Sequence, residues 1–405
     1  MPPPERPGRP PNACPRVRIL DPEDAAAGEE GSPPLRRPPR FSVRFENVAP
    51  TALDRLRTEA RSLGGELVEA TGAVAGRPAI GGVTVEATGE AFDRLLLRLD
   101  GPGASMPALR LTLAGALSHR WRRSERTVRG AHRSFLVGGR TLVMGVVNVT
   151  PDSFSDGGRF VDPPIAIAEA LSMVEDGADL LDVGGESTRP GATPVPPDVE
   201  WDRIAPVLDG LKGRVPIPIS VDTRHAEVAR RAVVAGADVV NDVSGLVDPE
   251  MRGVVRELGA AAIVMHLRGE PKTMQEDTRY DDLLGEVYGR LADALETAES
   301  DGIGADRLLV DPGLGFGKTP AQSLSLLAHL GELRSLGRPV VVGASRKSFL
   351  GWALGGVPIE QRAEAGLAAA VLASRLGADV LRTHDVGPTV RALKFSDRLR
   401  GPPTG

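Results

Sequence analysis

The sequence predicts an α/β protein in which a (β/α)8 TIM barrel follows a small α/β domain and a proline-rich tail. Three observations predict this fold class. Eight short apolar runs recur between about residues 141 and 398. A Gly-Ala-Asp motif marks three of the junctions, and the first 40 residues hold 12 of the 35 prolines. We divide the chain into a tail at 1–40, a small domain with a helical linker at 41–126, and the barrel at 127–405.

The tail is expected to be mostly disordered, because proline removes backbone donors and fixes φ. It contains one strand-like segment at Arg16–Leu20. From Phe41, the run FSVRFENV alternates apolar and polar residues as a half-buried strand does. A helix with proline in its first turn and Gly64-Gly65 after its end follows. The expected elements of this domain, of β-α-β-β-α ferredoxin-like type, are a strand from Phe41, a helix at Pro50–Leu63, strands at Glu66–Thr71 and Gly82–Ala87, a helix at Glu90–Leu99 and a helical linker at Ser105–Arg126.

The small domain has no catalytic constellation, so a docking or stabilising module is the better interpretation of it.

The barrel shows a clear pattern of buried strands. Its runs are apolar on both faces, which indicates buried parallel strands, and parallel strands need helical crossovers. Eight such units in about 260 residues match the usual size of this barrel. The expected strands are Leu142–Val147, Asp179–Val183, Ile217–Val221, Asp238–Asn241, Ala261–Met265, Leu308–Val310, Pro339–Gly343 and Asp379–Leu381.

The Gly-Ala-Asp motif at 177–179, 236–238 and 377–379 supports this count, with a looser copy at 259–261. Glycine after a helix adopts the left-handed conformation at little cost, so each copy ends a helix and opens a strand. Three residues after each aspartate stands a polar residue: Asp182, Asn241 or Arg382. Barrel enzymes place their chemistry at such strand ends. A doubly wound sheet is the alternative, and eight regular units argue against it.

Composition excludes several classes of function. Net charge is −5, aromatic residues make up 3%, and no basic stripe is visible, so a nucleic-acid partner is not expected. The basic stretch Arg120–Arg129 is interpreted as a solvated linker helix. The single cysteine, Cys14, excludes disulfides within the chain and fits a reducing compartment. No apolar run suits a bilayer span or a secretory signal, so we expect a cytoplasmic protein without membrane partners.

Polar residues end several of the expected strands: Asn148, Asp222, Asn241, Asp311, Arg382 and His384. An unpaired buried polar group costs about 1–3 kcal/mol, so these groups satisfy either one another or a ligand. Six at one face favour the ligand. Carboxylates and an amide suit the N–H-rich edge of a nitrogen heterocycle. Arg382 and His384 lie on one side of a strand and suit phosphate, whereas the Asn148 oxygen suits Mg2+ held partly by phosphates.

Three polar loops follow the expected strands. The loops at 148–158 and 184–191 are rich in glycine, which suits lids that exclude water. The segment at 343–349 runs into a helix start and carries Arg346 and Lys347, which suits an anion. The segment at 311–318 superficially resembles a phosphate loop but lacks the required spacing.

Taken together, these segments resemble dihydropteroate synthases. Seven motifs occur in order over about residues 141–398: MGVVNVTPDSFSDGG, GGESTRPGA, SVDT, NDVSG, DPGLGFGK, GASRKSFLG and RTHDV. The family joins 6-hydroxymethyl-7,8-dihydropterin pyrophosphate to 4-aminobenzoate and releases pyrophosphate. The resemblance therefore implies a transferase of folate biosynthesis that forms a C–N bond and acts as a homodimer, with Mg2+ as its cofactor and these two small molecules as its substrates.

The resemblance also implies three subsites. The pterin pocket comprises Asp222, Asn241, Asp311 and Lys347, walled by Met265, Phe316 and Gly343. The pyrophosphate and Mg2+ end comprises Asn148, Arg189, Arg382 and His384. The aminobenzoate lies among Thr188, Pro190, Phe154 and Phe316, with its carboxylate at Ser348. The implied reaction is dissociative C–O cleavage, in which Asp156 helps to stabilise a transient pterin cation.

Two rival interpretations share the pterin pocket. A pterin-binding methyl-transfer barrel lacks the pyrophosphate end and the Ser-Arg-Lys-Ser loop, and both are present in this sequence. A catalytically inactive paralogue would lack some of the residues that the reaction needs. All of these are retained in this sequence: Asn148, Arg189, Lys347, Arg382 and His384. A sugar-phosphate barrel is a more distant rival. Gln322-Ser323 stands where the family often has His-Asn, which puts the support of that loop in doubt. His266 and Asp182 are expected to support the site rather than to catalyse.

Overall fold

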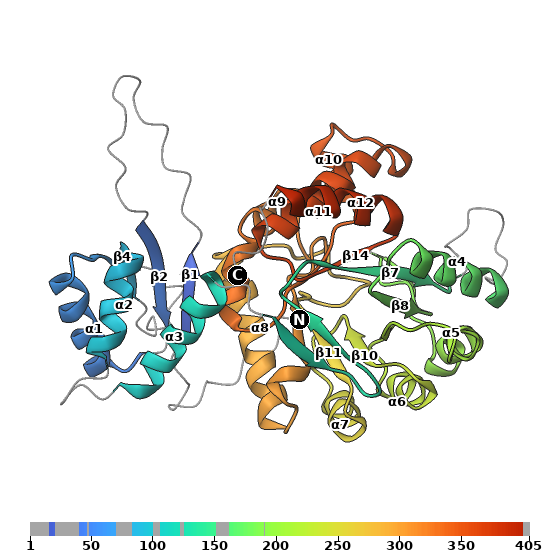
Figure 1. The fold of residues 1–405 in the computed structure, drawn as a ribbon, viewed down its shortest axis with the longest axis horizontal. Coiled ribbons are helices and arrows are strands. Elements are labelled where there is room, and N and C mark those ends of the chain that lie inside the picture. The colour runs from blue at the N-terminus through green and yellow to red at the C-terminus, as the bar shows by residue number, and fades with distance from the viewer. Residues whose placement is uncertain are drawn as a thin grey trace. The chain divides into compact units, whose positions relative to one another are not determined.

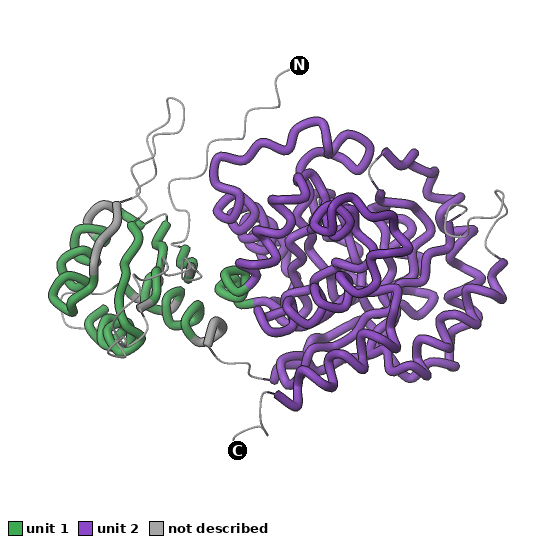
Figure 2. The backbone as a smooth tube through the Cα atoms, turned by 90° about the horizontal axis from the view of Figure 1, so that it is seen from above, with its two compact units in different colours: residues 1–122, 331–337 green, residues 123–330, 338–405 purple. Residues whose placement is uncertain are grey.

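The computed structural model describes residues 16–20, 40–46, 48–69, 83–99, 106–121, 125–150, 162–189 and 191–399. The chain divides into two compact units, coloured separately in Figure 2. Unit 1 comprises residues 1–122 and 331–337, and unit 2 comprises residues 123–330 and 338–405. Apart from Arg16–Leu20, the predicted proline-rich tail lies outside the described residues up to residue 39.

Unit 1 contains a four-stranded antiparallel sheet in the order β1-β2-β4-β3. Every strand and helix expected for the small domain is present. The sheet also includes Arg16–Leu20, so its first strand precedes the predicted boundary at residue 40. Because β4 lies between β2 and β3, these strands and α1 form a split β-α-β unit, as expected of a ferredoxin-like domain. The elements are β1 (Arg16–Leu20), β2 (Arg40–Glu46), α1 (Pro50–Ser62), β3 (Glu66–Glu69), β4 (Val83–Thr88), α2 (Gly89–Arg98) and α3 (Pro107–Trp121).

The core of unit 1 confirms the alternating strand and corrects the prediction made for α3. Val43 and Phe45 of β2 are fully buried, as the alternating pattern predicts. Leu109 and Leu113 of α3 are also buried in this core, so the helix predicted as a linker is an integral part of the domain.

The prediction of a solvated linker helix for the basic stretch Arg120–Arg129 is wrong over Arg126–Arg129, because these residues form strand β5.

Unit 2 is a barrel of eight parallel strands enclosed by helices (Figure 1). The sheet runs β12-β11-β10-β9-β8-β7-β14-β13, and a parallel bridge from Val310 to Val340 joins its two edges. All eight predicted strands are confirmed to within two residues at either end. Their bounds are β7 (Leu142–Asn148), β8 (Leu180–Gly184), β9 (Ile219–Asp222), β10 (Val239–Asp242), β11 (Ala261–Met265), β12 (Leu308–Asp311), β13 (Val341–Gly343) and β14 (Val380–Thr383).

The crossovers between these strands are helical, as parallel pairing requires. The main helices are α4 (Pro163–Glu175), α5 (Pro197–Leu211), α6 (Ala226–Ala235), α7 (Pro249–Leu258), α8 (Leu283–Ser300), α9 (Pro320–Ala328), α10 (Ser348–Ala353), α11 (Ala363–Leu376) and α12 (Val386–Arg398). Short 3-10 turns occur at η2 (Ala305–Arg307), η3 (Leu330–Leu336) and η4 (Ile359–Gln361). Within the described residues, no helix is long and apolar enough to cross a membrane.

A hairpin closes the amino end of the barrel. Strands β5 (Arg126–Arg129) and β6 (Ser134–Val137) pair antiparallel ahead of β7. Val128, Phe135 and Val137 pack in one cluster with interior side chains of the barrel strands, such as Met144 and Ile263. The amino end is therefore filled with apolar side chains, which leaves the carboxyl end for a site.

The Gly-Ala-Asp motif has a structural role at this same amino end. Gly177, Gly236 and Gly377 have φ values of 97°, 129° and 118°, as predicted for residues that end helices. The aspartate of each copy accepts a hydrogen bond from a backbone N–H of a neighbouring strand or of the residue just before that strand. The pairs are Asp179 with Val143 N at 2.9 Å, Asp238 with Ile219 N at 3.1 Å, and Asp379 with Val340 N at 2.9 Å. The motif therefore links neighbouring strands at the point where they begin.

Candidate active site

A cavity of about 430 Å3 opens at the carboxyl end of the strands. This volume is in the range of small-molecule sites. The predicted site residues that line it are Asn148, Thr188, Arg189, Asp222, Phe316, Gly343, Lys347, Ser348, Arg382 and His384. Asn241, Met265 and Asp311 lie at the ends of β10, β11 and β12 and are not among its lining residues. Phe154, Asp156 and Pro190 lie outside the described residues, so their predicted roles stay predictions.

Arg382 joins two strand-end carboxylates across the barrel. Its Nε donates to Oδ2 of Asp182 at 2.5 Å, and its Nη2 donates to Oδ2 of Asp222 at 2.7 Å. Asn241 also donates to Oδ2 of Asp182, at 3.1 Å. Burial lowers the pKa of Arg382, but the attraction of both carboxylates outweighs burial and raises this pKa overall. Asp182 is fully buried and holds two other side chains, as expected of a supporting residue.

Asp222 and Glu186 are the two carboxylates that line the cavity among the described residues. Burial raises the pKa of Asp222 to about 7, and the nearby Arg382 opposes this shift. The group therefore changes charge close to neutral pH. In its charged form it can accept hydrogen bonds from a heterocycle, and in its neutral form it can donate one.

Lys347 and Phe316 form a second wall of the cavity. The Nζ of Lys347 donates to the Leu314 carbonyl at 2.5 Å and lies 4.7 Å from the centre of the Phe316 ring. Burial lowers the pKa of Lys347 to about 8, although the Asp311 carboxylate favours the charged form. Burial likewise raises the pKa of Asp311, whose Oδ1 accepts from Gly313 N at 2.7 Å. The cation thus lies beside an aromatic face where a flat ring can stack.

His384 lies between the loops after β7 and β13. Its Nδ1 is 3.2 Å from the Ser345 hydroxyl, and its Nε2 is 3.4 Å from Nδ2 of Asn148. Burial, together with the charge of Arg382, lowers the pKa of His384 to about 4. The ring is therefore neutral near pH 7 and can donate one hydrogen bond. Because Asn148 turns its amide nitrogen toward His384, its oxygen is left as one neutral ligand for a hard cation such as Mg2+, which takes its other ligands from phosphate and water.

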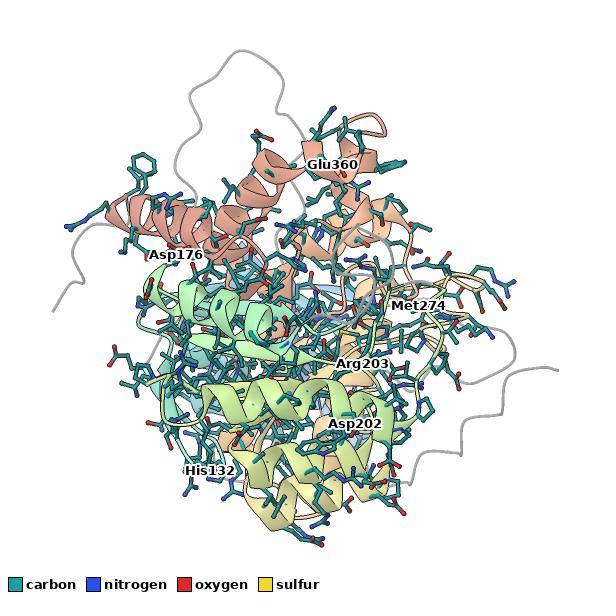
Figure 3. The ribbon with its side chains drawn as sticks, turned by 90° about the vertical axis from the view of Figure 1, so that its right-hand side faces the viewer. His132, Asp176, Asp202, Arg203, Met274 and Glu360 are labelled. Atoms are coloured by element: carbon teal, nitrogen blue, oxygen red, sulfur yellow. The ribbon has the colours of Figure 1, made fainter. Side chains whose placement is uncertain are left out.

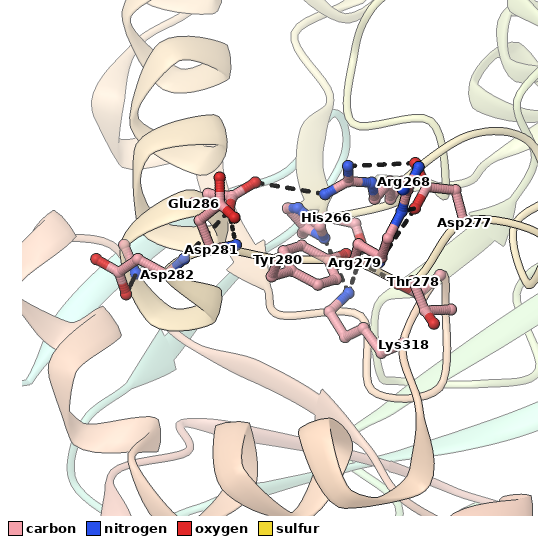
Figure 4. Close-up of polar contacts among 12 residues, drawn as sticks. His266, Arg268, Asp277, Thr278, Arg279, Tyr280, Asp281, Asp282, Glu286 and Lys318 are labelled. Atoms are coloured by element: carbon pink, nitrogen blue, oxygen red, sulfur yellow. Dashed lines mark hydrogen bonds and ion pairs between the residues drawn. The ribbon is translucent and has the colours of Figure 1, made fainter. Parts of the chain in front are cut away.

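The loop after β12 is held by a buried lysine, Lys318, which Figure 4 shows beside His266. The Nζ of Lys318 donates to the Gly313 carbonyl at 3.0 Å and to the Phe316 carbonyl at 2.9 Å, and lies 2.9 Å from Nδ1 of His266. Burial lowers the pKa of both Lys318 and His266 well below their usual values. Lys318 therefore supports the loop and does not point at a phosphate.

Ser323 also supports this loop, which answers the doubt raised by its unusual identity. Its hydroxyl accepts from Gly315 N at 3.1 Å and donates to the Thr319 carbonyl at 3.0 Å. Gln322 completes a capping box with Thr319 at the start of α9. The loop that carries Phe316 is thus anchored at both ends.

The loop after β13 is strained. Arg346 has φ +60°, a left-handed conformation that costs energy for any residue with a side chain. Its guanidinium pairs with Asp385 at 2.6 Å, and its carbonyl accepts from Arg362 at 3.2 Å. This arrangement places Lys347 and the exposed Ser348 on the cavity at the start of α10.

Some lining residues were not anticipated. Met274 belongs to the long loop after β11, and Ile359 and Arg362 lie around η4. They stand far from any strand end and in segments without periodicity, so no sequence signal pointed to them.

Comparison with known proteins agrees with the geometry. Residues 144–384 match the protein family described as pterin binding enzyme. The chain is 45% identical over 263 residues to a dihydropteroate synthase from Synechocystis sp., covering 65% of this chain and 91% of that protein. It is 38% identical over 397 residues to a probable bifunctional folylpolyglutamate synthase/dihydropteroate synthase from Haloferax volcanii, covering 95% of this chain but only 46% of that relative.

Solved structures give the same result for the barrel. Xanthomonas albilineans dihydropteroate synthase with 4-aminobenzoic acid matches with a TM-score of 0.64 and 44% identity, over 69% of this chain and 100% of that one. The same enzyme in complex with 7,8-dihydropteroate matches with a TM-score of 0.62 and 42% identity, again over 69% and 100%. The chain described here therefore belongs to the dihydropteroate synthase family of pterin-binding enzymes.

Proposed function

We propose that this chain is a dihydropteroate synthase. It condenses 6-hydroxymethyl-7,8-dihydropterin pyrophosphate with 4-aminobenzoate, giving 7,8-dihydropteroate and pyrophosphate in folate biosynthesis. The observation that carries the proposal is the cavity at the carboxyl end of the barrel, where Asp222 lies beside Arg382, Lys347 and His384. Such a site can hold a heterocycle and an anion together.

The heterocycle binds at the carboxylate end. Asp222 accepts hydrogen bonds from the N–H-rich edge of the pterin, and Asn241 and Asp311 contribute from neighbouring strands. Lys347 donates to a ring acceptor. The flat ring packs against Phe316 and Gly343 and, once bound, reaches Met265 at the end of β11.

The pyrophosphate binds at the basic end, at Arg189, Arg382 and the neutral His384. Arg382 is already oriented by two carboxylates, so it loses little further freedom when it binds an oxygen of the leaving group. Asn148 provides the protein ligand for Mg2+, which when bound neutralises charge that develops on the departing pyrophosphate.

The aminobenzoate binds under the loops after β7 and β8. Phe154, Phe316, Pro190 and Thr188 hold its ring, and Ser348 meets its carboxylate.

The reaction breaks the C–O bond between the pterin methylene and pyrophosphate. The electron pair leaves with the oxygen, and Asp156 stabilises the transient cation. The aniline nitrogen then forms the C–N bond and loses its proton to solvent. His384 stays neutral at neutral pH, because its pKa is about 4, and so it does not act as an acid.

The decisive experiment is a turnover assay with the pterin pyrophosphate, 4-aminobenzoate and Mg2+, with and without a sulfonamide competitor. Dihydropteroate and pyrophosphate should form in equal amounts, and Asn148→Ala should raise the Mg2+ concentration required. Absence of product from well-folded protein would refute the proposal. Product formation that is independent of Mg2+ would refute the metal assignment alone.

The cytoplasmic, homodimeric state implied by the family completes the proposal. Two large apolar side chains, Leu372 of α11 and Phe395 of α12, are 54% and 70% exposed, which suits helices that pair with a second copy. Sedimentation equilibrium should give twice the chain mass, and Phe395→Glu should shift the protein toward the monomer. A wild-type monomer at micromolar concentration would exclude the dimer.

A further inference from the structure

A cluster of two glutamates and one histidine lies beside the cavity. Glu186 follows β8, Glu200 stands in the first turn of α5, and His225 precedes α6. Their ligand atoms all lie within 4.8 Å of one another. The Nε2 of His225 is 3.3 Å from Oε2 of Glu186 and 3.9 Å from Oε2 of Glu200. The mechanism proposed above uses none of these three side chains.

Glu200 is fully buried beside the side chain of Thr223. It is 0% exposed, and neither of its carboxylate oxygens has a hydrogen-bond partner in acceptable geometry among the described residues. The Nε2 of His225 also lacks one in that part of the chain. A buried carboxylate without partners is costly, and native proteins rarely leave one so.

The nearby arginines are engaged elsewhere. Arg224 contacts Glu186 through two nitrogens, at 3.2 and 3.4 Å. Arg203 of α5, labelled in Figure 3, donates to the Gly185 carbonyl at 2.7 Å. A hydrogen bond from His225 to Glu186 would satisfy that pair and would still leave Glu200 unsatisfied. A cation positioned between the three side chains would satisfy all of them.

The spacing suits a metal ion. An ion about 2.1 Å from each of its ligands in tetrahedral geometry holds them about 3.4 Å apart. The distances of 3.3 and 3.9 Å lie close to this value. Two carboxylates and one imidazole are three protein ligands that leave one position open, and imidazole favours zinc, copper, iron or nickel over magnesium.

We propose that Glu186, Glu200 and His225 bind a divalent transition-metal ion. This site differs in its residues and its chemistry from the Mg2+ site assigned to Asn148. Glu186 lies two residues before Thr188, and His225 lies three residues after Asp222. The ion therefore ties the loop after β8 to the end of β9, where two of the predicted substrate contacts begin.

The test measures metal binding without substrates. Metal-free protein is titrated with Zn2+ in excess Mg2+, so that the site at Asn148 is saturated. The wild type should bind one equivalent of Zn2+. Glu200→Gln and His225→Gln should each weaken binding by more than about 100-fold, exceeding the effect of altering groups that only surround ligands. The control is Glu227→Gln, which alters an exposed carboxylate in the first turn of α6 and should bind Zn2+ as the wild type does.

A second measurement requires no variant. X-ray absorption of the zinc-loaded wild type should show imidazole scattering among oxygen ligands. Failure to bind one equivalent, undiminished binding in both variants, or a zinc environment without imidazole would each overturn the proposal. Dihydropteroate synthesis is assayed separately, so failure of the metal-binding proposal can be distinguished from failure of the proposed function.

Discussion

The two ends of the barrel use aspartate in opposite ways. At the amino end, Asp238 receives backbone N–H groups from His132, Arg133 and Ile219, at 3.1, 2.7 and 3.1 Å, and its contact with the Arg133 guanidinium is longer, at 3.5 Å. At the carboxyl end, Asp222 faces the side chain of Arg382, and burial raises its pKa to about 7. A carboxylate satisfied by backbone groups fixes the chain, whereas one balanced against a side-chain cation beside a cavity remains available to a ligand. The comparison predicts that the two ends can be damaged independently.

The largest effect should follow from Arg382→Ala. Loss of this cation removes the group oriented toward developing negative charge, so kcat/KM should fall by about 1,000-fold, or roughly 4 kcal/mol. Steady-state turnover measures the loss, and circular dichroism checks that the protein is folded. Arg375→Ala, an exposed arginine in the last turn of α11, is the control and should remain fully active. More than a tenth of wild-type activity in Arg382→Ala would contradict the assignment.

The opposite end is tested by Asp238→Ala. Three backbone N–H groups lose their acceptor, the buried one of Ile219 among them, so the free energy of unfolding should decrease by about 3 kcal/mol. Because the cavity lies at the other end of the strands, kcat should stay within about two-fold of wild type at a temperature where the protein is folded. Urea denaturation and turnover separate the two effects. A selective loss of kcat with unchanged stability would erase the distinction between the two ends.

The pH dependence sharpens the comparison at the carboxyl end. Asp222 gains its charge as pH rises through about 7, and Lys347 loses its charge as pH rises through about 8. If both charges are needed to bind the pterin pyrophosphate, kcat/KM should rise about tenfold per pH unit below the pKa of Asp222. It should fall about tenfold per pH unit above the pKa of Lys347. Lys347→Arg keeps the cation and should remove the alkaline decline. A profile that declines identically in this variant would rule out Lys347 as its source.

The smallest effect should follow from Ser323→Ala. The hydroxyl makes two hydrogen bonds to the loop that carries Phe316, so its loss should cost about 1 kcal/mol of stability. The KM for the pterin substrate should rise only a few-fold, because Lys318 still holds the same loop. Thermal unfolding and initial rates test this together. No change in either quantity would mean that Lys318 alone anchors the loop.

The sequence was sufficient for the strands and for most of the predicted lining of the cavity. Strands buried on both faces give apolar runs, and polar residues at their ends stand out against those runs. The periodicity of α3 was also available, since Leu109, Leu113 and Leu117 recur at helical spacing and all are buried. The position of this segment between two domains suits a linker, whereas its pattern indicates a core helix.

The features that could not be predicted depend on contacts between residues far apart in the sequence and not on local sequence patterns. Spacing indicates which side of β14 carries Arg382, but not that Asp182 and Asp222 share its guanidinium. The β5–β6 hairpin has strands of four residues, too short for a distinct alternation. Met274 and Arg362 reach the cavity from loops, where tertiary packing alone decides position. The cluster of Glu186, Glu200 and His225 likewise joins three segments that no motif connects.

Asp379 has a consequence for how the barrel is made. Its side chain binds Val340 N ahead of β13, and its carbonyl accepts from Leu142 N of β7 at 2.8 Å. One residue near the carboxyl terminus thus fastens the last strands to the first. During synthesis, β7 emerges early and waits with one edge unpaired until residue 379 has left the ribosome. The nascent barrel is therefore open, and most prone to aggregate, for nearly the whole time of its translation.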